Sequence, residues 1–79
     1  MSDITTLDEL DFGQFATIHK VRGEGAIRRR LLDMGLTNGA QIELVRTSPL
    51  GDPKEFRLRG YNLSLRKEEA QFVQITMER

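Results

Sequence analysis

The sequence predicts a mainly β domain with one helix, in which about five short strands form a small closed sheet. Three observations lead to this prediction. Apolar and polar residues alternate in several short runs, which glycine, asparagine and proline separate. One segment alone has apolar residues at helical spacing, and strands and helices do not alternate as they do in βαβ units. A closed sheet is favoured because it leaves no exposed strand edges.

The alternating runs place the strands along the chain. We expect strands over residues 14–21, 40–47, 54–59, 63–66 and 72–77, a helix over 24–36, and a single helical turn over 67–71. Residues 6–10 form either a helical turn or an irregular lead-in. Val21 is out of phase with Ile18, which indicates a bulge or the end of the first strand. The expected inward-facing residues are Ala16, Ile18, Ile42, Leu44, Phe56, Leu58, Leu63, Leu65, Val73, Ile75 and Met77.

The predicted helix has one apolar face and a clear stop signal. Ile27, Leu31 and Met34 recur at i, i+4 and i+7, so they share a face and are expected to hold the helix on the sheet. Gly35 is expected to end the helix, because glycine adopts the left-handed conformation without a Cβ penalty. Leu36 would then pack back on Leu31 as the hydrophobic contact of a Schellman motif.

The outer surface of the same helix carries three arginines. Arg29 and Asp33 lie opposite the apolar face and are spaced to form an i,i+4 ion pair. Arg28 and Arg30 flank that face, and Arg30 is expected to be structural. Leu32 points toward the polar side, where it either contacts a partner or packs against the N-terminal segment.

Two turns and one stiff loop connect the later strands. Gly39 ends a turn over residues 37–39, and a second tight turn is expected over 60–62. Prolines bracket the loop between the second and third predicted strands, which stiffens it. Leu50 at the tip of this loop is either folded back or displayed to a partner, and the sequence leaves both alternatives open.

Length and composition exclude several classes of protein. The 79 residues suffice for one domain, 1–79. The absence of cysteine excludes a disulfide framework, a thiolate metal site and a cysteine nucleophile. No apolar run is long enough to span a membrane, and the acidic N-terminus lacks the features of a signal peptide. We therefore expect a soluble, cytoplasmic protein.

Catalysis and tight metal binding find little support in the side chains. His19 is the single histidine, and we expect it on the face of a strand rather than in a catalytic or metal site. A weak site for Fe²⁺ or another divalent ion stays open, formed by His19 with acids such as Glu24, Asp52 or Glu55. We therefore expect no enzymatic activity and no resident cofactor.

The charges are unevenly distributed although the net charge is zero. Residues 14–67 hold eleven lysines and arginines against five acids, so a basic barrel that binds nucleic acid is one hypothesis. Its phosphate contacts would come from Arg22, Arg28, Arg46, Arg57, Arg59 and Arg66. The acidic termini and the scarcity of aromatic side chains count against it, so we expect no nucleic acid partner.

Three segments, in their order and spacing, together resemble one protein family. They are Arg30–Leu36 with Asn-Gly two residues later, the Pro-Leu-Gly-Asp-Pro segment of residues 49–53, and the Leu-Ser-Leu-Arg-Lys-Glu-Glu-Ala segment of residues 63–70. The chain is thereby similar to the FeoA family of bacterial ferrous iron transport proteins over about residues 7–77. FeoA-like domains also occur in metal-dependent repressors, behind a DNA-binding domain. This chain has none ahead of it and resembles the free-standing protein.

The resemblance implies an SH3-like β-barrel with the helix packed at one side. It also implies a cytoplasmic accessory or regulatory protein that binds FeoB, a membrane permease with a GTPase domain, and is recruited through FeoB to the inner face of the membrane. Self-association stays open. The displayed apolar and basic side chains suggest where such a partner would bind. The expected contact residues are Arg28, Leu32, Pro49, Leu50, Gly51, Asp52 and Pro53.

Overall fold

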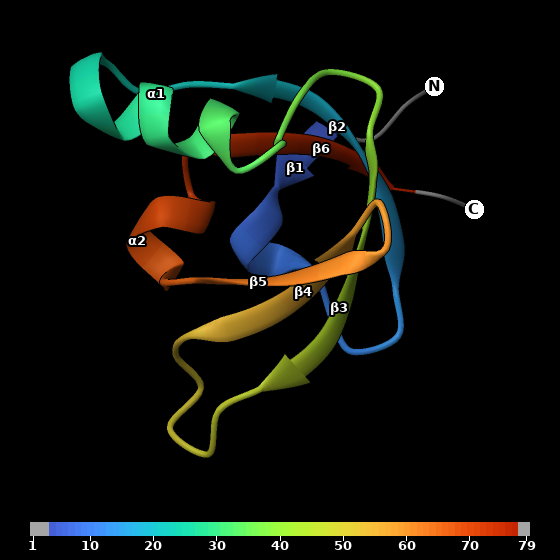
Figure 1. The fold of residues 1–79 in the computed structure, drawn as a ribbon. Coiled ribbons are helices and arrows are strands. Elements are labelled where there is room, and N and C mark those ends of the chain that lie inside the picture. Colours follow the sequence, from blue (N-terminus) through green and yellow to red (C-terminus); the bar gives the residue numbers. More distant parts are fainter. Residues whose placement is uncertain (1–3, 78–79) are drawn as a thin grey trace.

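The computed structural model describes residues 4–77, which form one antiparallel sheet curled around a single core (Figure 1). The strands are β1 (Ile4–Thr6), β2 (Phe15–Val21), β3 (Gln41–Thr47), β4 (Lys54–Leu58), β5 (Tyr61–Leu65) and β6 (Val73–Met77). The helical segments are the 3₁₀ turn η1 (Leu7–Glu9), α1 (Gly25–Asp33) and α2 (Lys67–Ala70). The strand order β1-β6-β2-β3-β4-β5 leaves β1 and β5 as the two edges of the sheet. The prediction that the sheet is closed is therefore wrong: within residues 4–77, the short strand β1 pairs with β6, and no ladder joins it to β5. The mainly β prediction with one main helix is confirmed.

Strand alternation explains the core. Phe56 and Leu58 of β4 are completely buried, while Arg57 between them points to solvent. The other strands also bury alternate residues over most of their length, except β1, which has no buried residue. All the predicted inward residues are buried except Met77, which is only partly buried. The core comprises Leu7, Leu10, Ala16, Ile18, Val21, Leu31, Leu36, Ala40, Ile42, Leu44, Phe56, Leu58, Leu63, Leu65, Ala70, Val73 and Ile75.

A bulge in β2 explains the phase of Val21. The pairing of β2 with β6 shifts between Ile18 and Lys20, so His19 is the extra residue. The shift turns Val21 into the core, where it is almost fully buried. The predicted irregularity is therefore confirmed, and His19 is left exposed at the bulge.

The C-terminus of α1 forms the predicted Schellman motif. The Gly35 amide donates to the Leu32 carbonyl (3.0 Å) and the Leu36 amide to the Leu31 carbonyl (3.3 Å), with Gly35 at φ 96°. Leu31 and Leu36 are both completely buried. Ile27 and Met34 pack against the core but are only partly buried, so Leu31 is the main anchor of the helix.

Two details of the predicted strand pattern are wrong. The sequence analysis missed β1, which has a single strongly apolar residue, Ile4, and is held by pairing with β6. The last tight turn lies one residue earlier than predicted. Arg59 (φ 51°) and Gly60 (φ 84°) are its two central residues, and Tyr61 is already the first residue of β5.

The short helix α2 is tied to the rest of the fold by Glu69. This carboxylate is only 7% exposed. Its Oε1 accepts a hydrogen bond from the Arg66 amide (2.9 Å), and its Oε2 pairs with Arg30 of α1, 39 residues away. Arg30 therefore holds α1 to α2, which confirms that it is structural.

Candidate functional site

The loop between β3 and β4 is a compact turn that holds Leu50 in solvent. The Gly51 amide donates to the Ser48 carbonyl (2.8 Å), and the Ser48 hydroxyl donates to the Asp52 carbonyl (2.8 Å). The Ser48 amide also donates to the Pro53 carbonyl (3.2 Å) across the base of the loop. Leu50 at the tip is 93% exposed. Of the two alternatives that the sequence left open, the structure therefore shows Leu50 displayed.

Asp52 has a structural role within this loop. Its Oδ1 accepts a hydrogen bond from the Lys67 amide at the start of α2 (2.7 Å). Its Oδ2 lies 4.0 Å from the Arg66 guanidinium. These contacts fix the loop against the end of β5, so Asp52 positions the turn while Leu50 stays in solvent.

The outer surface of α1 differs from the prediction in two respects. Leu32 is partly buried against the core, so it offers less surface than expected. Within residues 4–77, Arg29 and Asp33 form no ion pair, and both side chains extend into solvent. Arg28 is exposed as predicted, and with Leu32 it lines an open hollow of about 330 Å³ on the helix surface.

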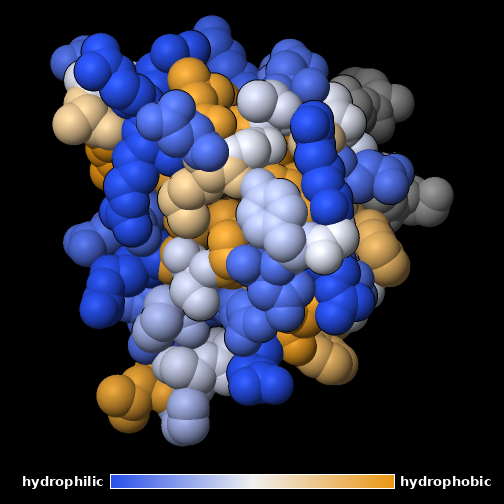
Figure 2. Space-filling model, viewed as in Figure 1, coloured by the Kyte–Doolittle hydropathy of each residue, from blue (hydrophilic) through white to orange (hydrophobic). Residues whose placement is uncertain are grey.

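The structure places the two predicted contact regions at opposite ends of the molecule. In Figure 1, α1 lies at the top of the view, the loop between β3 and β4 at the bottom, and α2 between them. The loop tip is an isolated hydrophobic spot amid polar surface in Figure 2. The residues Pro49–Pro53 are thus grouped together, whereas Arg28 and Leu32 form a separate surface.

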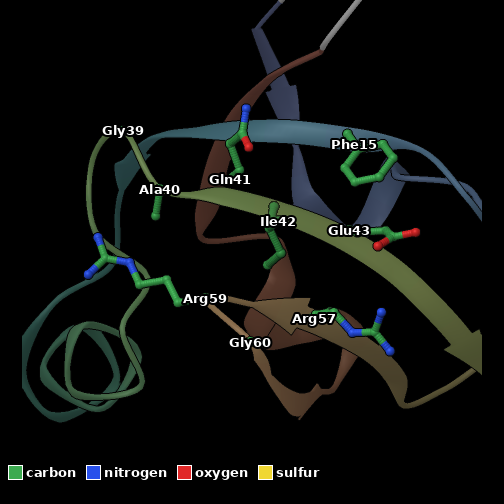
Figure 3. A pocket seen from close by; sticks show the side chains of 9 residues that line it. All are labelled: Phe15, Gly39, Ala40, Gln41, Ile42, Glu43, Arg57, Arg59 and Gly60. Atoms are coloured by element: carbon green, nitrogen blue, oxygen red, sulfur yellow. The ribbon is translucent and has the colours of Figure 1, made fainter.

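A third surface, on the outer face of the sheet, was not singled out by the sequence analysis. It is an open pocket of about 460 Å³ between the start of β2 and the turn joining β4 to β5 (Figure 3). Phe15, Glu43 and Arg57 stand side by side in register across β2, β3 and β4. Phe15 is 52% exposed. Neighbouring residues of a strand point to opposite faces of the sheet, and Ala16 was expected to face inward. This pattern would have predicted that the ring of Phe15 lies on the outer face.

The candidate ligands of the weak metal site belong to no three-ligand cluster in the described part of the chain. Among residues 4–77 there is no group of three or more histidine, cysteine or acidic residues that could hold a metal ion. Glu55 accepts a hydrogen bond from Asn62 (2.7 Å), and Asp52 is engaged with α2. A weak site formed by His19 and a single carboxylate stays an open alternative, and the absence of a resident cofactor stays a prediction.

The arginines proposed as phosphate contacts for nucleic acid do not form one surface. Arg57 and Arg59 line the outer pocket of the sheet, Arg22 and Arg28 line a different cavity beside α1, and Arg66 lies near Asp52. A duplex or a single strand needs a continuous track of cations, which this scatter does not provide.

Across residues 4–77, none of the helices has the length and apolarity required to cross a membrane.

Comparisons with known proteins agree with this architecture. A family model described as the FeoA domain matches residues 5–77. An Fe(2+) transport protein A/Fe(2+) transporter FeoB fusion protein from Porphyromonas gingivalis is 41% identical over 71 residues, which are 90% of this chain but 8% of that protein. The chain thus spans a small part of that relative.

Solved structures also match. An FeoA-like protein from Clostridium acetobutylicum has a TM-score of 0.89 and 35% identity, covering 98% of this chain and 90% of that one. FeoA of Stenotrophomonas maltophilia, crystallised with zinc and described as a prokaryotic SH3 domain protein, has a TM-score of 0.83 and 29% identity. That match covers 95% of this chain and 96% of the other. The SH3-like fold predicted for the chain is therefore confirmed.

Proposed function

Because the chain belongs to the FeoA family, which is associated with ferrous iron transport, we propose that it is an accessory protein of ferrous iron uptake. It acts by binding an FeoB-like permease that carries a GTPase domain, at the cytoplasmic face of the membrane. It performs no catalysis and needs no resident cofactor. Its effect on the permease is regulatory, exerted through protein–protein contact.

The observation that carries this proposal is the fused relative. In the Porphyromonas gingivalis protein, a segment 41% identical to this chain is part of the same polypeptide as an Fe(2+) transporter FeoB. Covalent linkage keeps two partners at high effective concentration, and is useful where the linked modules act on each other. A separate chain of the same family needs a binding surface to achieve the same association.

The β3–β4 loop supports the proposal because it offers such a surface. Three internal hydrogen bonds hold it in one shape, so little conformational entropy is lost when it binds. A leucine that is 93% exposed gains apolar burial only when another molecule covers it. Asp52 anchors the loop to α2, so the tip is presented from a rigid base.

Leu50→Glu tests the proposal in cells that lack the native protein. We expect this variant to fold normally and to lose most of the iron uptake that the parent restores, because a carboxylate at the tip cannot enter an apolar pocket. The measurement is the initial rate of Fe²⁺ accumulation. Phe12→Glu is the matched control, since Phe12 is 77% exposed outside this loop and receives the same charge. Equal uptake by parent and Leu50→Glu would contradict the proposed contact.

The alternative functions gain no specific support. Nucleic acid binding lacks a continuous basic surface, and the metal-sensing hypothesis lacks a ligand cluster among the described residues. Fe²⁺ binding by the chain itself can be measured by anaerobic calorimetric titration. We expect no saturable heat, whereas saturable binding that disappears in His19→Ala would replace the accessory role with direct sensing.

A further inference from the structure

The cavity beside α1, of about 570 Å³ and wide open to solvent, lies where β2 ends next to the N-terminal half of the helix. The side chains of Lys20, Arg22 and Arg28 line it, together with one acid, Glu24. The partly buried ring of Phe72 forms an apolar part of the wall. Three exposed cations and one exposed anion therefore share a single shallow site with a net charge of about +2.

These three cations have no partner among residues 4–77, as is also true of Arg29 on the outer surface of α1 but not of the arginines in the other clusters. In the outer pocket of the sheet, Arg57 donates to Asn62 (3.4 Å) and Arg59 to Thr37 (3.0 Å). Arg30 pairs with the carboxylate of Glu69, and Arg66 faces the carboxylate of Asp52. No hydrogen bond or ion pair within the described chain engages the side chains of Lys20, Arg22 or Arg28.

Unpaired like charges in one cavity repel one another, and an anion entering the cavity removes that repulsion. The ligand needs more than one negative charge, because Glu24 cancels one of the cations and thereby weakens the attraction for a single carboxylate. Two guanidinium groups and an ammonium match the several oxygens of phosphate, which accepts paired hydrogen bonds from arginine.

We propose that the cavity lined by Lys20, Arg22 and Arg28 binds a phosphate-bearing group. This group either carries two or more negative charges itself or lies in a surface made of other anionic groups. Two sources supply this chemistry: a free polyphosphate, and the headgroup of an anionic phospholipid. The site goes beyond the accessory function proposed above and does not rest on it: it shares Arg28 with the expected contact residues but includes neither Leu50 nor the β3–β4 loop.

Amide chemical shifts during a titration with inorganic pyrophosphate test the site directly. We expect saturable shifts at Gly23 and Glu24, and binding about tenfold weaker in Arg22→Gln/Arg28→Gln, since each exposed ion pair contributes a few-fold. The control variant Arg46→Gln removes an exposed arginine on β3 that does not line the cavity. Sodium chloride at matched ionic strength separates binding from general screening.

Co-sedimentation with vesicles distinguishes the two sources. Vesicles of phosphatidylglycerol in phosphatidylcholine are compared with phosphatidylcholine alone, using the parent and the same variants. The site is supported if the double variant loses binding and Arg46→Gln keeps it, in either the pyrophosphate or the vesicle experiment. The experiment in which this happens identifies the source of the phosphate group. The proposal is overturned if neither probe binds, or if Arg46→Gln weakens binding as much as the double variant. Thermal unfolding of each variant confirms that the fold is intact.

Discussion

Replacing Glu69 by alanine is expected to lower the free energy of unfolding by about 1–2 kcal/mol, because one buried carboxylate serves two partners. The Arg66 amide at the start of α2 loses its acceptor, a capping contribution of about 1 kcal/mol. The ion pair with Arg30 is also lost, and its contribution is reduced because the Arg30 side chain is 61% exposed. Urea unfolding followed by circular dichroism measures the change.

Two further variants separate these contributions. Glu68→Ala removes the same charge from the neighbouring exposed position of α2, and should change stability by less than about 0.5 kcal/mol. Glu69→Gln keeps an oxygen for the Arg66 amide while it removes the charge, so its loss should be intermediate. The explanation of α2 is wrong if Glu69→Ala and Glu68→Ala unfold at the same urea concentration.

Gly35→Ala is expected to cost about 2–3 kcal/mol, since this position has both a left-handed backbone and a close neighbour. At φ 96° an L side chain is strained, and a Cβ built on Gly35 would collide with the Tyr61 hydroxyl. That hydroxyl donates a hydrogen bond to the Met34 carbonyl at the end of α1. The tyrosine can move aside only by giving up this bond. Thermal or urea unfolding provides the measurement.

Gly39 provides a matched control for the backbone effect. It has a similar φ of 89°, but no atom lies within 4 Å of a Cβ added there, so Gly39→Ala should cost only about 1 kcal/mol. Tyr61→Phe removes the colliding oxygen, and the penalty of Gly35→Ala should therefore shrink in that background. Equal penalties for Gly35→Ala and Gly39→Ala would show that Tyr61 contributes nothing to the effect.

Local patterns predicted most of the fold because its core follows strand alternation. The phase of Val21 indicated a bulge or the end of the strand, and the structure has the bulge. Gly35 and Leu36 predicted the end of the helix correctly. Strand β1 was missed because its stability comes from pairing with β6, 70 residues away, and not from its own pattern. The turn was misplaced because Arg59 adopts the positive φ that is usually assigned to glycine or asparagine.

The candidate sites depended more strongly on tertiary contacts. Sequence alone identified the proline-bracketed loop but could not decide whether Leu50 was buried, since that depends on what the fold places beneath it. The ion pair expected between Arg29 and Asp33 does not form, whereas Arg30 pairs with Glu69 across 39 residues. The convergence of Lys20, Arg22 and Arg28 likewise requires β2 and α1 to meet in space.

Site-specific crosslinking to the permease shows whether the tip of the β3–β4 loop lies at the contact between the two proteins. The chain contains no cysteine, so Leu50→Cys introduces a single attachment point for a photoactivatable crosslinker, and Phe12→Cys provides the same chemistry elsewhere. We expect the label at position 50 to crosslink to the full-length FeoB-like permease in membranes. The label at position 12 should not crosslink to it. Crosslinking from position 12 but not from position 50, or from neither, would contradict this expectation.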